Sequence, residues 1–219
     1  AAETVALARE LALIETTGAR GHITQLSCAR SVAQLADARE RDLAVTAAVS
    51  AHHLHLSEQD IGEFDTRCHV IPPLRSLTDR NGLRQGLTDG VIEAICSDHQ
   101  PHGLDAKLAP FSESSPGIAG LETLLSLTLK LVDEGVLKLP EAVAALTANP
   151  ARILGIDTGQ LSIGARADLC VFDPTEQWQV DAGKLRSNGS NTPFDGQSLP
   201  GTVRWTLVSG EVVFAQDRE

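Results

Sequence analysis

Residues 91–102 read Val91-Ile92-Glu93-Ala94-Ile95-Cys96-Ser97-Asp98-His99-Gln100-Pro101-His102. The first half is mostly apolar, as expected for a strand that is buried on both faces, and Asp98, His99 and His102 follow it directly. In a βα barrel the active site lies at the carboxyl ends of the strands. A carboxylate there can bind a divalent metal or take a proton from metal-bound water. The stretch therefore predicts a parallel α/β sheet with a candidate site at one strand end, although Asp98 alone could equally be a structural carboxylate or helix cap.

The same alternation of strand and helix extends on both sides of this stretch. Apolar runs predict strands at 21–26, 43–49 and 91–96. Helical spacing of apolar residues predicts helices at 3–17, 78–87, 121–136 and 140–147. A further helix is predicted to begin after Ser27, with Ser27 as its N-terminal cap. Strands that alternate with helices imply parallel βα units. Three strands are too few for an eight-stranded barrel, which needs roughly 250 residues. We therefore expect residues 1–155 to form the C-terminal half of a TIM-type (β/α)8 barrel, and the absence of methionine indicates that the chain does not begin at a natural start.

After residue 155 the sequence pattern changes from alternating strands and helices to short strand-like runs. Short strand-like runs at 159–161, 167–172, 203–208 and 211–214 are separated by Gly, Pro and Asp turns. Ser209-Gly210 between the last two runs is a hairpin signal. We interpret 173–200 as a long polar connection. Residues 156–219 are therefore expected to form the C-terminal portion of a small β domain, part of a β-sandwich.

Composition excludes several classes of function. The net charge of -11 argues against nucleic acids and anionic membranes as partners. No apolar run approaches the ~20 residues of a membrane-spanning helix. The four cysteines lack CxxC spacing, so we expect reduced thiols in a cytoplasmic protein.

The remaining histidines are weaker signals. Of the adjacent pair His52-His53, the usual arrangement is one packed and one exposed side chain. His55 and His69 are expected to be surface or loop histidines. We expect His22 to be buried under flanking helices.

Several further motifs occur in a fixed order. They are Pro72-Pro73-Leu74-Arg75, Gly120-Leu121-Glu122-Thr123, Asn149-Pro150-Ala151-Arg152, Gly164-Ala165-Arg166-Ala167-Asp168-Leu169 and Asn191-Thr192-Pro193-Phe194. With the 97–102 stretch, where the family reads Thr-Asp-His-Ala-Pro-His, this order resembles the bacterial-type dihydroorotases of the amidohydrolase superfamily over essentially the whole chain. Hydantoinases and allantoinases share that fold but fit the Pro-Pro-Leu-Arg and Asn-Thr-Pro-Phe stretches less well.

The resemblance implies a mechanism and a set of site residues. Active family members hold a hydroxide on one or two zinc ions against the carbon of a ring amide. Asp98 matches the aspartate that binds metal and shuttles the proton, and His102 matches a histidine that holds the substrate. The resemblance also implies a substrate-binding role for Pro116 and Gly117.

Two departures from the family pattern indicate a degenerate site. Gln25 stands where the family has a metal-ligating histidine, and an amide oxygen is a far weaker zinc donor than an imidazole. Ile71 stands where the family has an asparagine that contacts the substrate, and isoleucine cannot replace those hydrogen bonds. We therefore expect zinc to be weakly bound or absent.

The resemblance then implies a non-catalytic protein of pyrimidine biosynthesis. Some bacteria pair aspartate transcarbamoylase with a dihydroorotase-like chain that lacks metal ligands, and we expect this structural role and a homo-oligomer. The alternative is an active zinc-dependent dihydroorotase that hydrolyses dihydroorotate to carbamoyl aspartate, with upstream ligands and Asp98 holding a single metal.

Overall fold

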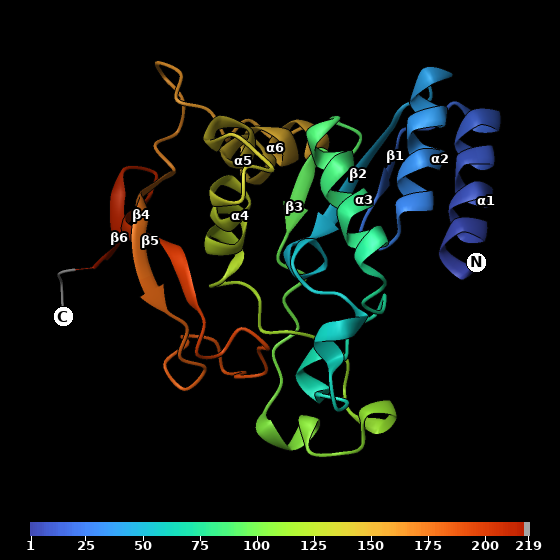
Figure 1. Cartoon of the computed structure of the whole chain (residues 1–219). Helices are drawn as coiled ribbons and strands as arrows, with labels where there is room; N and C mark the ends of the chain where they lie inside the picture. The colour runs from blue at the N-terminus through green and yellow to red at the C-terminus, as the bar shows by residue number, and fades with distance from the viewer. Residues whose placement is uncertain (217–219) are drawn as a thin grey trace.

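The computed structural model describes residues 1–216 and contains two separate three-stranded sheets (Figure 1). The helices are α1 (Ala2–Thr17), α2 (Ala29–Glu40), α3 (Leu77–Thr88), α4 (Leu124–Asp133), α5 (Leu139–Leu146) and α6 (Ala148–Leu154). The strands are β1 (Gly21–Ile23), β2 (Val45–Ser50), β3 (Ala94–Cys96), β4 (Leu169–Gln179), β5 (Ser198–Val208) and β6 (Glu211–Ala215). No helix within residues 1–216 is long and apolar enough to cross a lipid bilayer.

The first sheet has the order β1-β2-β3 and is parallel throughout. Its central strand β2 is almost fully buried, which explains its continuous apolar sequence. The predicted parallel βα units are therefore confirmed. Helices α1, α2 and α3 lie together on one side of this sheet (Figure 1) and share a hydrophobic core with it. Because the strands are parallel, their carboxyl ends meet at one edge of the sheet.

The second sheet is antiparallel, with the order β4-β5-β6. The predicted hairpin between β5 and β6 is confirmed, since Ser209 (φ 51°) and Gly210 (φ 85°) both adopt the left-handed conformation of a tight hairpin turn. The sheet packs against α4, where the Trp178 indole donates to Ser126 Oγ at 2.8 Å. Val180, Phe194 and Leu199 belong to the same continuous core as the parallel sheet. The division at residue 155 stays a prediction.

Two sequence predictions in the second half of the chain are wrong, and one helix was missed. Residues 173–200 are not one long connection, because β4 continues to Gln179 and β5 begins at Ser198. A register shift between Asp173 and Gln177 interrupts the pairing, which resumes at Gln177. The run 159–161 is not a strand, and the Leu161 side chain in it is exposed. Helix α6 was not predicted; its Pro150 lies in the first turn, where proline is tolerated.

The predicted cap of α2 is also wrong. Ser27 does not cap this helix, since its hydroxyl donates to the Glu3 carboxylate and accepts from Arg75 Nε at 2.7 Å. Glu3 itself accepts from the backbone N–H groups of Ser27 and Cys28, at 3.2 and 3.3 Å. A carboxylate from α1 therefore binds the two N–H groups that precede α2, and the first N–H of the helix, on Ala29, donates to the Asp79 carboxylate at 3.1 Å.

His55 is buried instead of lying on the surface, because its Nε2 bonds the Leu127 carbonyl of α4 at 2.8 Å. Burial lowers the pKa of His55 from 6.5 to about 4; Arg84 and Lys130 lower it slightly further, and the Leu127 carbonyl and Glu134 oppose the shift. The unfolded chain therefore binds more protons than the folded chain between these two pH values.

Acidification should consequently destabilise the fold. The His55 contribution is complete above pH 6.5 and is lost as the pH falls towards 4, up to about 3 kcal/mol. Urea unfolding at pH 7.5 and pH 5 should show the loss. His55→Gln, which keeps a donor for the Leu127 carbonyl, should flatten the pH dependence. An unchanged slope in that variant would contradict the assignment.

Candidate functional site

The residues that could carry chemistry follow the carboxyl ends of the three parallel strands. Gln25 comes just after β1, Ser50 ends β2 and His52 follows it, and Asp98 comes just after β3. Because parallel strands end at a common edge, these side chains meet. The structure brings Gln25 and Asp98 together: they are 73 positions apart in the sequence and hydrogen-bonded.

The Asp98 carboxylate is the centre of this cluster. Its Oδ1 accepts hydrogen bonds from Gln25 Nε2 and, at 3.1 Å, from Gln100 Nε2. Its Oδ2 lies 3.9 Å from His52 Nε2. An amide oxygen facing a carboxylate would be repulsive, so both glutamines must present their nitrogen. Two neutral amides therefore act as donors to one almost fully buried carboxylate, and we call Gln25, Asp98 and Gln100 the amide clamp.

The backbone at both ends of the clamp is strained. Gln25 has φ 55° and Asp98 has φ 45°, so the backbone of both residues is in the left-handed region, which residues other than glycine rarely adopt. Each such residue costs of order 1–3 kcal/mol, less for aspartate, and strain of this kind clusters at functional sites. The strain turns both side chains towards each other.

The two adjacent histidines are both buried, so the expected arrangement of one packed and one exposed ring is wrong. His53 Nε2 bonds the Pro72 carbonyl at 3.1 Å, and this assigns its Nδ1 as the acceptor for Ser50 Oγ at 2.7 Å. Ser50 Oγ then accepts from His52 Nε2 at 3.2 Å. Burial, and then the neighbouring His53, hold the pKa of His52 well below its usual range. The contact between His52 and Asp98 is therefore one of a neutral imidazole and not an ion pair.

The loop after β3 brings together three predicted substrate-binding residues. His102 Nε2 bonds the Pro116 carbonyl at 3.0 Å. Gly117 donates to the His69 carbonyl at 2.8 Å and has φ 130°, and a Cβ on it would lie 2.5 Å from that of Gln100. Glycine is thus required where the backbone passes the clamp. Ile71 lies in the adjoining segment, and its side chain is exposed to solvent.

Asn191 was not recognised as a site residue from the sequence. Its side chain is only 3% exposed and bonds three backbone groups of the site loops: it accepts from His102 N at 2.7 Å and donates to the carbonyls of Gln100 and Gly117 at 3.0 and 2.9 Å. The available signal was its place in the Asn-Thr-Pro-Phe motif. Gln100 was missed as well, although it stands where the family motif has alanine. His99 lies beside them and accepts from Leu121 N at 3.2 Å.

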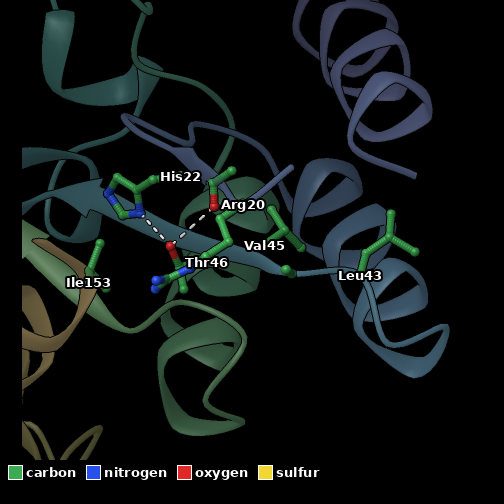
Figure 2. Close-up of a pocket in the computed structure, with 8 residues that line it drawn as sticks. Arg20, His22, Leu43, Val45, Thr46 and Ile153 are labelled. Carbon is green, nitrogen blue, oxygen red and sulfur yellow. Dashed lines mark hydrogen bonds between the residues drawn. The ribbon is translucent and has the colours of Figure 1, made fainter. Parts of the chain in front are cut away.

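A separate pocket of about 360 Å³ lies at the opposite, amino end of the strands (Figure 2). His22 Nδ1 lies 2.8 Å from Thr46 Oγ1 there, and the pocket is further lined by Arg20, Leu43, Val45 and Ile153. His22 is exposed, so its predicted burial under the helices is wrong, because the helices cover the other face of β1. The pocket takes no part in the Asp98 cluster.

Comparison with known proteins identifies the fold and the family. A model described as "Amidohydrolase family" matches residues 11–213. The chain belongs to the amidohydrolase family. It is 47% identical to a dihydroorotase-like protein of Pseudomonas putida, over 96% of this chain and 50% of that protein. It is 45% identical to a dihydroorotase of Syntrophus aciditrophicus, over 99% of this chain and 51% of that protein.

Solved structures agree with this placement. An L-hydantoinase from Arthrobacter aurescens superposes with a TM-score of 0.91 at 29% identity, over 97% of this chain and 49% of that chain. A D-hydantoinase from a Thermus species gives 0.90 at 26% identity, over 97% and 48%. The chain is thus a dihydroorotase-like amidohydrolase that spans about half the length of the curated relatives it matches.

The family implies a metal, and the residues described do not by themselves fit one. Within residues 1–216, no group of three His, Cys, Asp or Glu side chains could hold a metal ion. Asp98 and His52 are the two potential ligands of the cluster. The end of β1 supplies Gln25. Its amide nitrogen faces the Asp98 carboxylate and is not a zinc donor.

Proposed function

We propose that this chain forms the C-terminal half of a TIM-type barrel in a dihydroorotase-like protein of pyrimidine biosynthesis, and that this protein is non-catalytic. Its role is to support aspartate transcarbamoylase structurally. Family membership and the match to half of each hydantoinase support the fold. The relative from Pseudomonas putida that is named dihydroorotase-like, at 47% identity, is consistent with the role.

The amide clamp is the observation that carries this proposal. A buried carboxylate needs a cation or hydrogen-bond donors. Gln25 and Gln100 supply two N–H groups to the same oxygen of Asp98, so this oxygen has hydrogen-bond donors without a metal. Both glutamines depart from the family pattern, where histidine and alanine stand. Their joint presence replaces a ligand site by a hydrogen-bonded structural site.

An active dihydroorotase is the second candidate, because relatives at 45% and 43% identity carry that name. In that case Asp98 and His52 would contribute ligands and Gln25 would be tolerated. His102, Pro116 and Gly117 would hold the cyclic amide. The two candidates differ in turnover, which is directly measurable.

Co-assembly with aspartate transcarbamoylase tests the proposal. The protein at its natural length is mixed with the transcarbamoylase of the same organism and examined by size-exclusion chromatography with light scattering. We expect one complex of defined mass, without hydrolysis of dihydroorotate. Asp98→Asn is the matched control: its amide oxygen can still accept from Gln25, so assembly should persist. Separate elution of the two proteins, or clear turnover that Asp98→Asn abolishes, would contradict the structural role.

A further inference from the structure

Gln25 lies in a bulge that follows β1. The Gly21 N–H bonds the Ala44 carbonyl at 2.9 Å, and the Leu26 N–H bonds the Ala48 carbonyl at 3.2 Å. Five residue steps on this side therefore match four steps on β2, so the chain carries one extra residue here. A bulge of this kind re-aims a side chain at the end of a strand. The left-handed backbone of Gln25, with φ 55°, is thus part of a bulge and not of a regular strand.

The bulge is fixed on its C-terminal side by Ser27, which is only 1% exposed. The Ser27 N–H donates to one oxygen of the Glu3 carboxylate at 3.2 Å, and the Ser27 hydroxyl donates to the other oxygen. Arg75 donates from Nε to the Ser27 hydroxyl oxygen at 2.7 Å and from a terminal nitrogen to Glu3 at 3.3 Å. We call Glu3, Ser27 and Arg75 the Ser27 tie. Strained backbone persists where the surrounding structure over-determines it, and the tie lies two residues after Gln25.

The Ser27 tie is held by an ion pair with little access to water. The Glu3 and Arg75 side chains are 17% and 28% exposed. Burial alone would raise the pKa of the Glu3 carboxyl, but hydrogen bonds from Ser27, Ser31 and Cys28 hold it below its ordinary value. Glu3 is therefore ionised at neutral pH. Hydrogen bonds to an ionised partner are shorter and stronger than those between neutral groups, so the tie is strong enough to hold a strained turn.

The tie also gives a role to the Pro72-Pro73-Leu74-Arg75 motif, whose arginine is absent from the Asp98 cluster as described above. Arg75 is itself anchored, because its carbonyl accepts from the Glu58 N–H at 2.7 Å. Its side chain reaches Glu3 on α1, 72 positions earlier in the sequence. Two distant segments therefore meet on the residue that fixes the bulge.

We propose that Glu3 and Arg75 are positioning residues that hold the Gln25 side chain against the Asp98 carboxylate through Ser27. The inference goes beyond the proposed function, since the tie presents whatever side chain stands at position 25 to Asp98, with or without turnover. Gln100 provides an internal comparison. It donates to the same Asp98 oxygen from the loop after β3, outside the bulge.

Hydrogen exchange of the two glutamine side-chain amides, followed by NMR in the natural-length protein, tests the proposal. The Gln25 and Gln100 signals are identified by their loss in Gln25→Leu and Gln100→Ala. We expect Arg75→Met to accelerate exchange of the Gln25 amide about tenfold or more and to leave that of Gln100 unchanged. Arg75→Lys, which keeps the charge but loses the forked donor, should recover part of the protection.

Two further variants separate positioning from general stability. Ser27→Ala removes only the shared hydroxyl and leaves both charges in place, so the protein should fold and the Gln25 amide should again exchange faster. Arg41→Met is the matched control, since Arg41 pairs with Glu15 of the same helix α1 at 2.6 Å and joins α1 to the end of α2. It should leave both glutamine amides unchanged.

Faster exchange confined to Gln25, in Arg75→Met and Ser27→Ala but not in Arg41→Met, supports the proposal. Equal acceleration at Gln25 and Gln100 overturns it, because the tie would then only stabilise the protein as a whole. Unchanged exchange at Gln25 in both variants overturns it as well. Failure of the proposed function is seen elsewhere, in zinc content and turnover of the wild-type protein, and either result there leaves the positioning role standing.

Discussion

Replacing Gln25 by histidine is expected to raise the affinity of the protein for zinc by about 100-fold or more, because it restores a direct ligand and even changes beside a ligand typically alter affinity ~10–100-fold. The new imidazole would lie at the Asp98 carboxylate, where the Gln25 amide now donates. Together with His52, at 3.9 Å from the same carboxylate, it would complete a set of three protein donors. Zinc prefers nitrogen donors of this kind, and three protein ligands suffice for a catalytic site.

Zinc retained per chain after dialysis, measured by mass spectrometry, checks this prediction. Gln25→Leu is the control, since it removes the amide donor without adding a ligand and should gain no zinc. Gln100→Ala restores the family residue and removes the second donor, so combining it with Gln25→His should increase zinc retention further. Equal zinc in Gln25→His and wild-type protein would show that Gln25 does not limit the site.

Replacing Asn191 by leucine is expected to lower the free energy of unfolding by roughly 3–5 kcal/mol, because it leaves three buried backbone groups unpaired at about 1–3 kcal/mol each. These groups are the N–H of His102 and the carbonyls of Gln100 and Gly117. Leucine has nearly the same volume, so the loss comes from hydrogen bonding. The loops on both sides of the amide clamp should loosen together.

Urea unfolding checks the stability, and hydrogen exchange of the His102 amide checks the local effect. Asn188→Leu is the matched control, since Asn188 lies three positions earlier and is exposed. It should change stability by about 0.5 kcal/mol or less. If Asn191→Leu unfolds at the same urea concentration as the wild type, the side chain does not hold the site loops.

The sequence was informative where the signal is local. Hydrophobic periodicity predicted the three parallel strands and their helices, and Ser209-Gly210 predicted the β5–β6 hairpin. These features depend on neighbouring residues alone. The strand-end position of Asp98 also led directly to the site, since topology requires parallel strand ends to converge.

The errors arise where a distant residue decides the outcome. Ser27 has the right type for a helix cap, but its hydroxyl bonds Glu3 of another helix, and Asp79 accepts from the first N–H of α2. His55 and the His52-His53 pair are buried because α4 and the Pro72 carbonyl offer partners that lie far away in the sequence. Gln100 and Asn191 are polar residues in loops, and only their contacts reveal that they organise the site.

The zinc content of the natural-length wild-type protein, measured together with dihydroorotate hydrolysis on the same sample, tests the central claim most directly. The amide clamp predicts far less than one zinc ion per chain and no turnover above background. Stoichiometric zinc with clear turnover would contradict the account, and the chain would then be part of an active dihydroorotase that tolerates Gln25.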